Sequence, residues 1–362
     1  MSQTLRIIDS GLRSARANLS LTEALTRGRR AGTTPDSFRF QHFPRSAIVG
    51  RHQILPREVD LAWCAANDVA TARRMTGGGA IVMGPGLLGW ELILSRTLVP
   101  DGLAETSARL CGAIAAGLSR FGIAATYRPR NDIEVGGRKV SGTGGYFEGQ
   151  VLVFQGTVLV DLDIGFMTSA LNLPIRKLGK RGLDAFAERV CDLKGLLGTA
   201  PAMRTVEEAL AEAVGEALGL VPEWGTLTAA EEALAGEVHD TEIGRDAFVE
   251  GHDDAFPAPG RLVSHAVQTP GGLIEVTLKL RDGAGAIIDQ AVISGDYFAA
   301  PPRLAADLEA HLRQLPAEAA GEAAARFLDT AGARFLGLER ADVVAVVAEA
   351  ARQAAAPAGD VP

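Results

Sequence analysis

Short apolar runs separated by glycine clusters fill the first half of the chain, and this pattern constrains the fold most. Residues 46–49, 80–83 and 90–94 are mainly apolar, and each run is flanked by at least one glycine. Such runs are typical of short buried strands joined by tight turns. Residues 103–121 instead carry apolar side chains at helical spacing, and Gly122 follows them. Interleaved strands and helices predict an α+β fold built on a mixed β-sheet flanked by helices.

The length of 362 residues is enough for two modest domains. We expect residues 1–224, which hold the glycine-rich strands, to form a catalytic domain. Residues 225–259 are rich in Asp, Glu, Gly and Ala, and we expect a linker with one helix. In residues 260–356, apolar and polar side chains alternate over 273–280 before a glycine-containing turn leads into 287–293. This pattern predicts a hairpin within a small α+β domain.

Net charge and cysteine content exclude several classes of protein. The formal net charge of −8 argues against broad attraction to nucleic acid or to anionic lipid. The three cysteines, Cys64, Cys111 and Cys191, lack paired spacing, which argues against a disulfide framework. No apolar run is long enough to span a membrane, and the first residues lack the apolar region of a signal peptide. We therefore expect a soluble cytoplasmic protein without a membrane or nucleic-acid partner.

Arg74 lies two residues before Thr76, which opens a run of three glycines, Gly77 to Gly79. Without Cβ atoms, such a backbone can approach a ligand closely and turn successive N–H groups into one concavity. An arginine beside this loop supplies a planar fork of donors for phosphate or carboxylate oxygens. A triple glycine is also common in simple tight turns, so this motif alone leaves both interpretations open.

Two further patterns suggest a reacting site. Asp132 begins a strand-like run, and Lys139 follows a Gly-Gly turn. A lysine on such a hairpin can direct its charge at a developing oxyanion, although many lysines are simply solvated. Gln155 and Gly156 interrupt an apolar strand, which indicates either a β-bulge or the wall of a site.

Taken together and in this order, the patterns resemble lipoate–protein ligases, within the superfamily of biotin/lipoate ligases and octanoyltransferases. The resemblance extends along most of the chain. It rests on Gly50-Arg51-His52-Gln53, Arg73-Arg74-Met75-Thr76-Gly77-Gly78-Gly79-Ala80, Asn131-Asp132, Gly137-Arg138-Lys139-Val140-Ser141-Gly142, Gly156-Thr157 and Arg189-Val190-Cys191-Asp192-Leu193. Residues 271–276 and 293–298 resemble the accessory C-terminal domain of the larger ligases.

The resemblance implies a two-step reaction that consumes ATP. The carboxylate of lipoate attacks the α-phosphate of ATP, which gives lipoyl-AMP and pyrophosphate. A lysine amine on a lipoyl-carrier protein then attacks the mixed anhydride and forms an amide. The expected carrier is a dehydrogenase lipoyl domain, a glycine-cleavage H-type protein or a related carrier. ATP, Mg²⁺ and the substrate lipoate are the expected small ligands.

The resemblance also implies roles for particular residues. Lys139 is the expected catalytic residue, which bridges the acyl carbonyl and the phosphate. Asp132 is the expected ligand of Mg²⁺, a hard cation that prefers oxygen. ATP and the adenylate are expected to contact Arg74, Gly79, Ala80, Ile81, Val82, Asn131 and Lys139. Lipoate is expected to contact Gly77, Gly78, Lys139, Gly142, Gln155 and Gly156.

Departures from the ligase pattern keep an alternative open. Residues 83–86, Met-Gly-Pro-Gly, replace a His-Asp pair and resemble the octanoyltransferase branch, and Gln155 stands where histidine is frequent. The alternative function is an octanoyl or lipoyl transfer between carrier proteins that needs a nucleophilic cysteine and no ATP. One transferase branch has that cysteine where this chain has residues 129–131, Pro-Arg-Asn. The resemblance to biotin ligases is weaker, because their arginine-rich glycine loop is absent. A further alternative is a carrier-binding scaffold that has lost the chemistry. The presence of Arg74, Asp132 and Lys139 argues against it.

Overall fold

The computed structural model describes residues 4–100, 102–129, 131–173, 187–251, 260–281 and 286–356. The chain divides into two compact units, each with a hydrophobic core of its own. The first unit comprises Met1–Val49, Pro56–Arg74 and Ala80–Val249, and the second comprises Gly50–Leu55, Met75–Gly79 and Glu250–Pro362. Among the described residues, no helix combines the length and the apolar character needed to cross a bilayer.

An eight-stranded mixed sheet forms the centre of the first unit, in the order β11-β1-β2-β6-β10-β9-β8-β7. Its strands are β1 (Thr4–Leu12), β2 (Ser37–His42), β6 (Leu87–Ser95), β7 (Ala125–Arg128), β8 (Asp132–Val135), β9 (Arg138–Glu148), β10 (Val151–Leu159) and β11 (Val221–Gly225). Strand β1 pairs in parallel with β2 and β11, whereas the other neighbours are antiparallel. This architecture confirms the predicted α+β fold with a mixed sheet.

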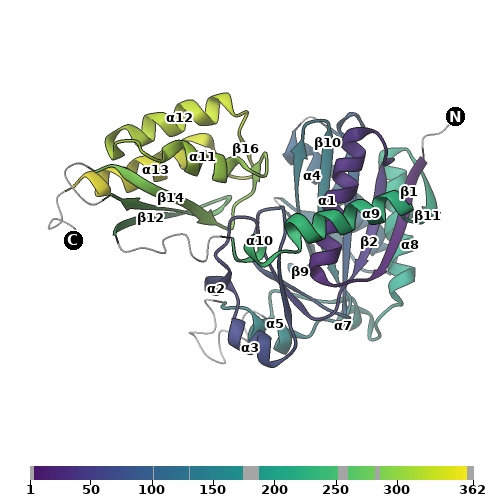
Figure 1. Cartoon of the computed structure of the whole chain (residues 1–362). Coiled ribbons are helices and arrows are strands. Elements are labelled where there is room, and N and C mark those ends of the chain that lie inside the picture. The colour runs from purple at the N-terminus through teal and green to yellow at the C-terminus, as the bar shows by residue number, and fades with distance from the viewer. Residues whose placement is uncertain are drawn as a thin grey trace. The chain divides into compact units, whose positions relative to one another are not determined.

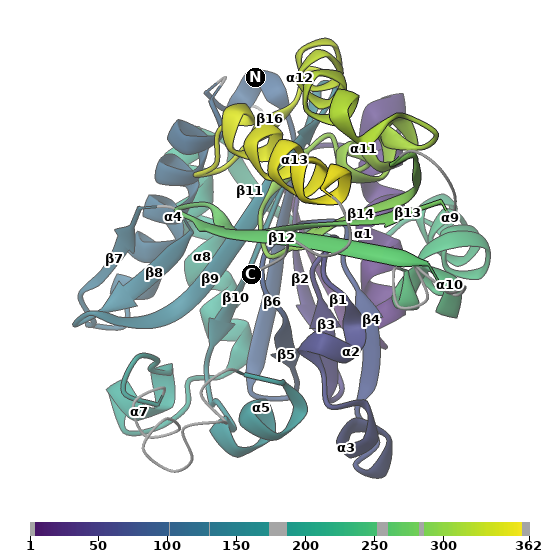
Figure 2. The ribbon, with the colours of Figure 1, turned by 90° about the vertical axis from the view of Figure 1, so that its left-hand side faces the viewer.

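Two pairs of helices cover the faces of this sheet (Figure 1). Helix α1 (Ala15–Ala31) packs against α9 (Ala229–Val238), and α4 (Leu103–Ser119) packs against α8 (Met203–Leu218). Figure 2 shows the sheet between the two pairs. Apolar side chains of α4 and α8 join the large side chains of the sheet in one core; examples are Leu110, Ile114, Leu210, Phe38, Trp90 and Phe154. Fully burying one such side chain contributes about 1.5–3 kcal/mol, so this layer holds the glycine-rich strands in place.

A smaller sheet in the same unit has the order β4-β3-β5. Its strands are β3 (Ser46–Val49), β4 (Ala70–Arg73) and β5 (Ile81–Met83). The short helices of this part of the chain are α2 (Leu55–Glu58), α3 (Leu61–Ala66), α5 (Ile164–Ala170) and α7 (Leu193–Leu197), with a 3-10 turn η1 (Arg96–Leu98). Strand β4 leads directly into Arg74, so the small sheet positions the backbone of this arginine.

The structure differs from the expected linker over residues 225–259. Strand β11 adds an edge to the large sheet, and α9, the π-helical turn η3 (His239–Ile243) and α10 (Asp246–Glu250) follow it; residues up to Val249 belong to the first unit. The acidic first turn of α9 pairs with arginines of the N-terminal segment: Glu231 lies 2.7 Å from Arg6, and Glu232 lies 2.6 Å from Arg13. These ion pairs explain why an acidic segment packs here instead of forming a linker; residues 252–259 lie outside the described residues.

The second unit is built on a three-stranded antiparallel sheet, β12 (Arg261–Thr269), β13 (Gly272–Leu280) and β14 (Ile288–Gly295). Helices α11 (Leu304–Leu312), α12 (Ala320–Thr330) and α13 (Arg340–Ala355), the turn η4 (Ala317–Ala319) and the short pair β15 (Ala299–Ala300) and β16 (Arg334–Phe335) complete it. The alternating residues Ile274, Val276, Leu278 and Leu280 are all buried in its core. The predicted hairpin between residues 273 and 293 is therefore confirmed.

Candidate functional site

Lys139 is the second residue of β9, which follows a two-residue glycine turn. Gly136 and Gly137 have φ angles of 58° and 77°, a left-handed conformation that glycine adopts without a steric penalty. The turn joins β8 to β9, and Glu134 is the cross-strand neighbour of Lys139. A register shift just before Glu134 bends the pair, so the lysine is held on a short, kinked hairpin.

The ammonium group of Lys139 faces the carboxylate of Asp132 on the adjacent strand. Its Nζ atom lies 2.7 Å from Oδ1 of Asp132, an ion pair without hydrogen-bond geometry. The other carboxylate oxygen pairs with Arg128, whose Nε atom also lies 2.6 Å from Oε1 of Glu134. Asp132 is buried, while the Lys139 side chain is 38% exposed. Two cations thus compensate one buried carboxylate, and the ammonium group remains accessible to solvent.

Gly142 makes room for this ammonium group. A Cβ atom at position 142 would lie 2.7 Å from Nζ and 2.8 Å from Cε of Lys139. Gly142 is also the cross-strand neighbour of Asp132 on β8 and of Thr157 on β10. The structure therefore brings together three of the predicted site residues, Lys139, Asp132 and Gly142, on neighbouring strands.

A distant segment fixes the backbone of Lys139. The Lys139 amide donates a hydrogen bond to the carbonyl of Arg189 at 2.9 Å, and the Cys191 amide donates one to the carbonyl of Lys139 at 2.9 Å. Val190 thereby forms an isolated parallel bridge with Lys139. In the sequence this segment is identifiable only by its resemblance to a family landmark. Its pairing with the backbone of Lys139 could not be predicted, because no local pattern indicates a contact between residues some fifty positions apart.

Gln155 and Gly156 lie on β10, next to the Lys139 strand. The register of β10 is continuous on both sides, so the β-bulge interpretation is wrong. A Cβ atom on Gly156 would lie 2.5 Å from the Trp90 ring and 2.8 Å from the carbonyl oxygen of Gly142. Gln155, Gly156 and Thr157 are partly exposed in an otherwise largely buried strand, which fits the alternative interpretation as the wall of a site.

Asn131 holds the segment before β8 against β9. Its Nδ2 atom donates to the carbonyl of Thr143 at 3.1 Å, and its own carbonyl accepts from the Thr143 amide at 2.7 Å. The Thr143 hydroxyl also donates to the Asn131 carbonyl at 3.0 Å and lies 3.3 Å from the sulfur of Cys111. These contacts orient Asn131 structurally, and its contact with the adenylate stays a prediction.

Arg74 is a buried cation at the end of the small sheet. Its guanidinium donates to the carbonyl of Ile48 at 3.4 Å, and its amide donates to the carbonyl of Val49 at 3.0 Å. Burial lowers the pKa of Arg74 to about 10, which leaves it charged at neutral pH. Ile81 and Val82 pair with β3 of the same sheet, and Ala80 directly precedes them. A buried arginine in such a setting suits an anionic ligand.

The triple glycine lies in the second unit, against the segment that follows β14. A Cβ atom on Gly77 would lie 2.0 Å from the carbonyl oxygen of Tyr297, and the Gly78 amide donates to that oxygen at 3.3 Å. The Tyr297 ring stacks on His52 with centroids 4.6 Å apart, and the Gly295 amide donates to the His52 carbonyl at 3.0 Å. The glycine loop, the segment of His52 and the segment of Tyr297 therefore lie in contact within the second unit. The close approach of the Tyr297 carbonyl oxygen is by itself enough to require glycine at position 77.

All three cysteines of the chain are buried. Burial raises the pKa of Cys64 and of Cys191, and it raises the pKa of Cys111 to about 11. Each thiol is therefore overwhelmingly protonated at neutral pH, whereas nucleophilic cysteines carry a lowered pKa. The arrangement provides an accessible amine at Lys139 but no activated thiolate.

Comparison with known proteins identifies the family of the chain. The family model of the lipoyl protein ligase A/B catalytic domain matches residues 14–215, and the chain belongs to this family of lipoate ligases and octanoyltransferases. Octanoyltransferase LipM of Symbiobacterium thermophilum is 26% identical over 269 residues, which cover 68% of this chain and 98% of that protein.

Two solved structures are also similar. The bi-partite lipoate protein ligase of Thermoplasma acidophilum, described with its E2 lipoyl domain, superposes with a TM-score of 0.63 at 25% identity, over 69% of this chain and 97% of that one. P. falciparum LipL1 in complex with lipoate superposes with a TM-score of 0.69 over 96% of this chain and 98% of that one. Its identity of 16% supports likeness of fold alone.

Proposed function

We propose that the protein is an ATP-dependent lipoate–protein ligase, which forms lipoyl-AMP and then lipoylates a lysine of a carrier protein. The observation that carries this proposal is the partly exposed Lys139 side chain, whose ammonium group pairs with Asp132 beside Gly142, in a chain whose three cysteines are all buried. A fixed cation of this kind suits a reaction between two anions, because it offsets their repulsion.

In the first step, a carboxylate oxygen of lipoate forms a bond to the α-phosphorus of ATP, and the bond to pyrophosphate breaks. Lys139 is proposed to contact both the attacking carboxylate and the phosphate and to neutralise charge on each. Arg74 and the backbone amides of Gly79, Ala80, Ile81 and Val82 are proposed to bind the nucleotide phosphate. The partly exposed wall at Gln155 and Gly156, with Gly77 and Gly78, is proposed to contact the acyl group.

In the second step, the carrier lysine amine attacks the acyl carbon and loses a proton, and the bond to AMP breaks. The oxyanion that forms on the acyl carbonyl is then stabilised by the ammonium of Lys139. The ion pair with Asp132 orients this ammonium group.

Asp132 fits the proposed role in Mg²⁺ binding. Its Oδ1 atom is buried, accepts no hydrogen bond and forms the ion pair with Nζ of Lys139, so Mg²⁺ would share or replace that contact. Mg²⁺ is commonly bound by one or two carboxylates together with substrate phosphates, and bound Mg²⁺ would neutralise phosphate charge. In the part of the chain that the structure describes, no group of three ligating side chains surrounds Asp132, so substrate phosphates and water would complete the coordination.

An octanoyl or lipoyl transferase that needs no ATP is the second candidate. The similarity to octanoyltransferase LipM favours it, as does the Gly84-Pro85-Gly86 turn that precedes β6. This mechanism requires a thiolate, and the raised pKa values of Cys64, Cys111 and Cys191 oppose it.

The proposed carrier is a lipoyl domain of a dehydrogenase, a glycine-cleavage H-type protein or a related carrier.

Exchange of labelled pyrophosphate into ATP separates the two candidates. The ligase exchanges label only when lipoate or another accepted acid is present, so lipoate, octanoate and biotin are compared in parallel. A transferase shows no exchange and instead moves the octanoyl group from an acylated carrier without ATP. That second result, together with its loss in a Cys→Ala variant, would replace the ligase proposal.

A further inference from the structure

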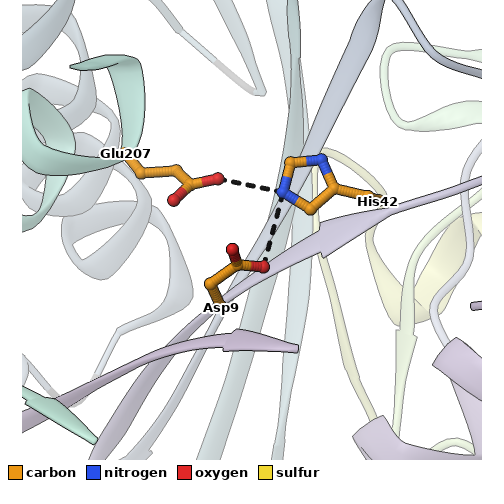
Figure 3. Close-up of side chains that lie close together, drawn as sticks. All are labelled: Asp9, His42 and Glu207. Carbon is orange, nitrogen blue, oxygen red and sulfur yellow. Dashed lines mark hydrogen bonds and ion pairs between the residues drawn. The ribbon is translucent and has the colours of Figure 1, made fainter. Parts of the chain in front are cut away.

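A second cluster of titratable side chains lies in the first unit, three positions in the sheet order away from the Lys139 strand. Asp9 lies on β1, His42 is the last residue of β2, and Glu207 lies near the start of α8. Figure 3 shows both carboxylates directed at the same ring nitrogen of His42. None of these residues takes part in the proposed ligase chemistry, and the inference does not depend on that proposal.

The distances within this cluster suit a shared metal ion. Nε2 of His42 lies 2.9 Å from Oε1 of Glu207 and 3.4 Å from Oδ1 of Asp9, and the three ligand atoms lie within 4.8 Å of one another. Ligands bonded at about 2.1 Å to one ion, at angles of about 90–110°, are about 3.0–3.4 Å apart. The two measured contacts of His42 fall near this range before any side chain moves.

The environment of Glu207 is a second, independent observation. Its side chain is only 2% exposed, and its Oε2 atom accepts no hydrogen bond. That oxygen forms a long ion pair with the guanidinium of Arg204, 3.8 Å away. A buried carboxylate oxygen without a hydrogen bond is costly, and an ion bound by both carboxylate oxygens of Glu207 would lower that cost.

The other two side chains leave a path from solvent. The side chains of Asp9 and His42 are 39% and 23% exposed, so an ion can reach the cluster without unfolding it. The amide of Gly11 donates to Oδ1 of Asp9 at 2.9 Å, a supporting contact of the kind that orients metal ligands. The cluster therefore has one buried ligand, Glu207, and two accessible ligands, of which Asp9 is held by a hydrogen bond.

We propose that Asp9, His42 and Glu207 form a binding site for a divalent transition-metal ion such as Zn²⁺. One imidazole nitrogen and two carboxylate oxygens are a donor set that such ions accept, and solvent would complete the coordination. Because the ligands come from β1, β2 and α8, the ion would join two sheet strands to a covering helix and stabilise the first unit. The competing occupant is a proton on Nε2, shared between the two carboxylates; the hydrogen bond to Glu207 already raises the pKa of His42.

Metal titration of the full chain distinguishes these occupants. Tag-free protein is stripped with a chelator and titrated with Zn²⁺ by calorimetry, and with Co²⁺ by visible absorption, which reports its ligand set. We expect one equivalent bound at the site, with an increase in melting temperature. Asp9→Asn and His42→Gln should each weaken binding by about tenfold or more, because each removes one ligand.

A matched control is His239→Gln, which removes an exposed histidine that also contacts an aspartate, Asp240, at 3.0 Å. This control should leave Zn²⁺ affinity unchanged. Asp9 is partly exposed, so Asp9→Asn tests the site even if His42→Gln destabilises the fold. Failure of the wild-type chain to bind one equivalent, or undiminished binding by Asp9→Asn, would show that the cluster holds only a proton.

Discussion

The position that a Cβ atom would take on Gly142 lies 2.7 Å from Nζ of Lys139. The glycine on β9 therefore leaves the space in which the lysine ammonium meets Asp132. Because Gly142 has no side chain, Lys139 can pair with Asp132 on the adjacent strand while its own side chain stays partly exposed. It also makes the position of the ammonium group testable without changing the lysine itself.

Gly142→Ala should lower the rate of adenylate formation by about tenfold or more and leave the fold intact. The methyl group would contact the flexible end of Lys139, so the ammonium group moves while the backbone stays. Single-turnover kinetics and circular dichroism provide the two measurements. Gly112→Ala is the control, because no atom lies within 4 Å of the added Cβ there, and it should retain the wild-type rate.

Lys139→Ala should reduce turnover by about 10²–10³, because one charge directed at a developing oxyanion is lost. Arg138→Ala removes the exposed cation next to it and should have a much smaller effect. Steady-state rates of carrier lipoylation measure both. A Lys139→Ala enzyme as fast as Arg138→Ala would identify Lys139 as a solvated surface residue.

Gly77→Ala should destabilise the second unit by roughly 1–3 kcal/mol, in the range for overpacking a tight contact. Its Cβ would lie 2.0 Å from the carbonyl oxygen of Tyr297, whereas a Cβ on the exposed Gly79 meets no atom within 4 Å. Hydrogen exchange of residues 288–295 measures the local free energy of unfolding. Equal protection in Gly77→Ala and Gly79→Ala would contradict the observed packing of the glycine loop.

Stability of the second unit should fall as the pH rises from about 4.5 to about 7. Burial raises the pKa of Glu309 from 4.5 to about 7, and its carboxylate accepts a hydrogen bond from the Ile293 amide at 2.8 Å. Because the folded-state pKa is the higher one, the folded state retains a proton that the unfolded state loses over this range. The loss is on the order of 3 kcal/mol, since each pKa unit corresponds to about 1.4 kcal/mol.

Glu309→Gln keeps an oxygen acceptor for the Ile293 amide but cannot ionise. Its local unfolding free energy, measured by hydrogen exchange at pH 5 and pH 8, should therefore change less with pH than that of the wild type. The same pH dependence in both proteins would mean that Glu309 is not the responsible group.

The α+β class, the Lys139 hairpin and the hairpin of the second unit could be predicted from sequence because each depends on local alternation and on glycine turns. Other features depend on long-range contacts. The segment around Val190 pairs with Lys139 through backbone groups that any sequence offers. The acidic residues of α9 predict a linker when the sequence is considered alone. In the structure they pair with Arg6 and Arg13, which are more than two hundred residues away in the chain.

The site residues divide in the same way. Asp132, Lys139 and Gly142 lie close in sequence, and their meeting follows from the hairpin register. The reason for glycine at position 77 could not be predicted, because its neighbour Tyr297 is more than two hundred residues away in the chain. The cluster at His42 was missed because its three ligands come from three separate elements.

The most direct test of the central claim is mass-spectrometric detection of lipoyl-AMP in a single turnover without carrier protein. ATP, Mg²⁺ and lipoate are supplied to the wild type, to Lys139→Ala and to three single variants, Cys64→Ala, Cys111→Ala and Cys191→Ala. We predict that the wild type and each folded cysteine variant form lipoyl-AMP, and that Lys139→Ala forms little. No lipoyl-AMP in the wild type, with octanoyl transfer from an acylated carrier that needs no ATP and fails in one cysteine variant, would contradict the account.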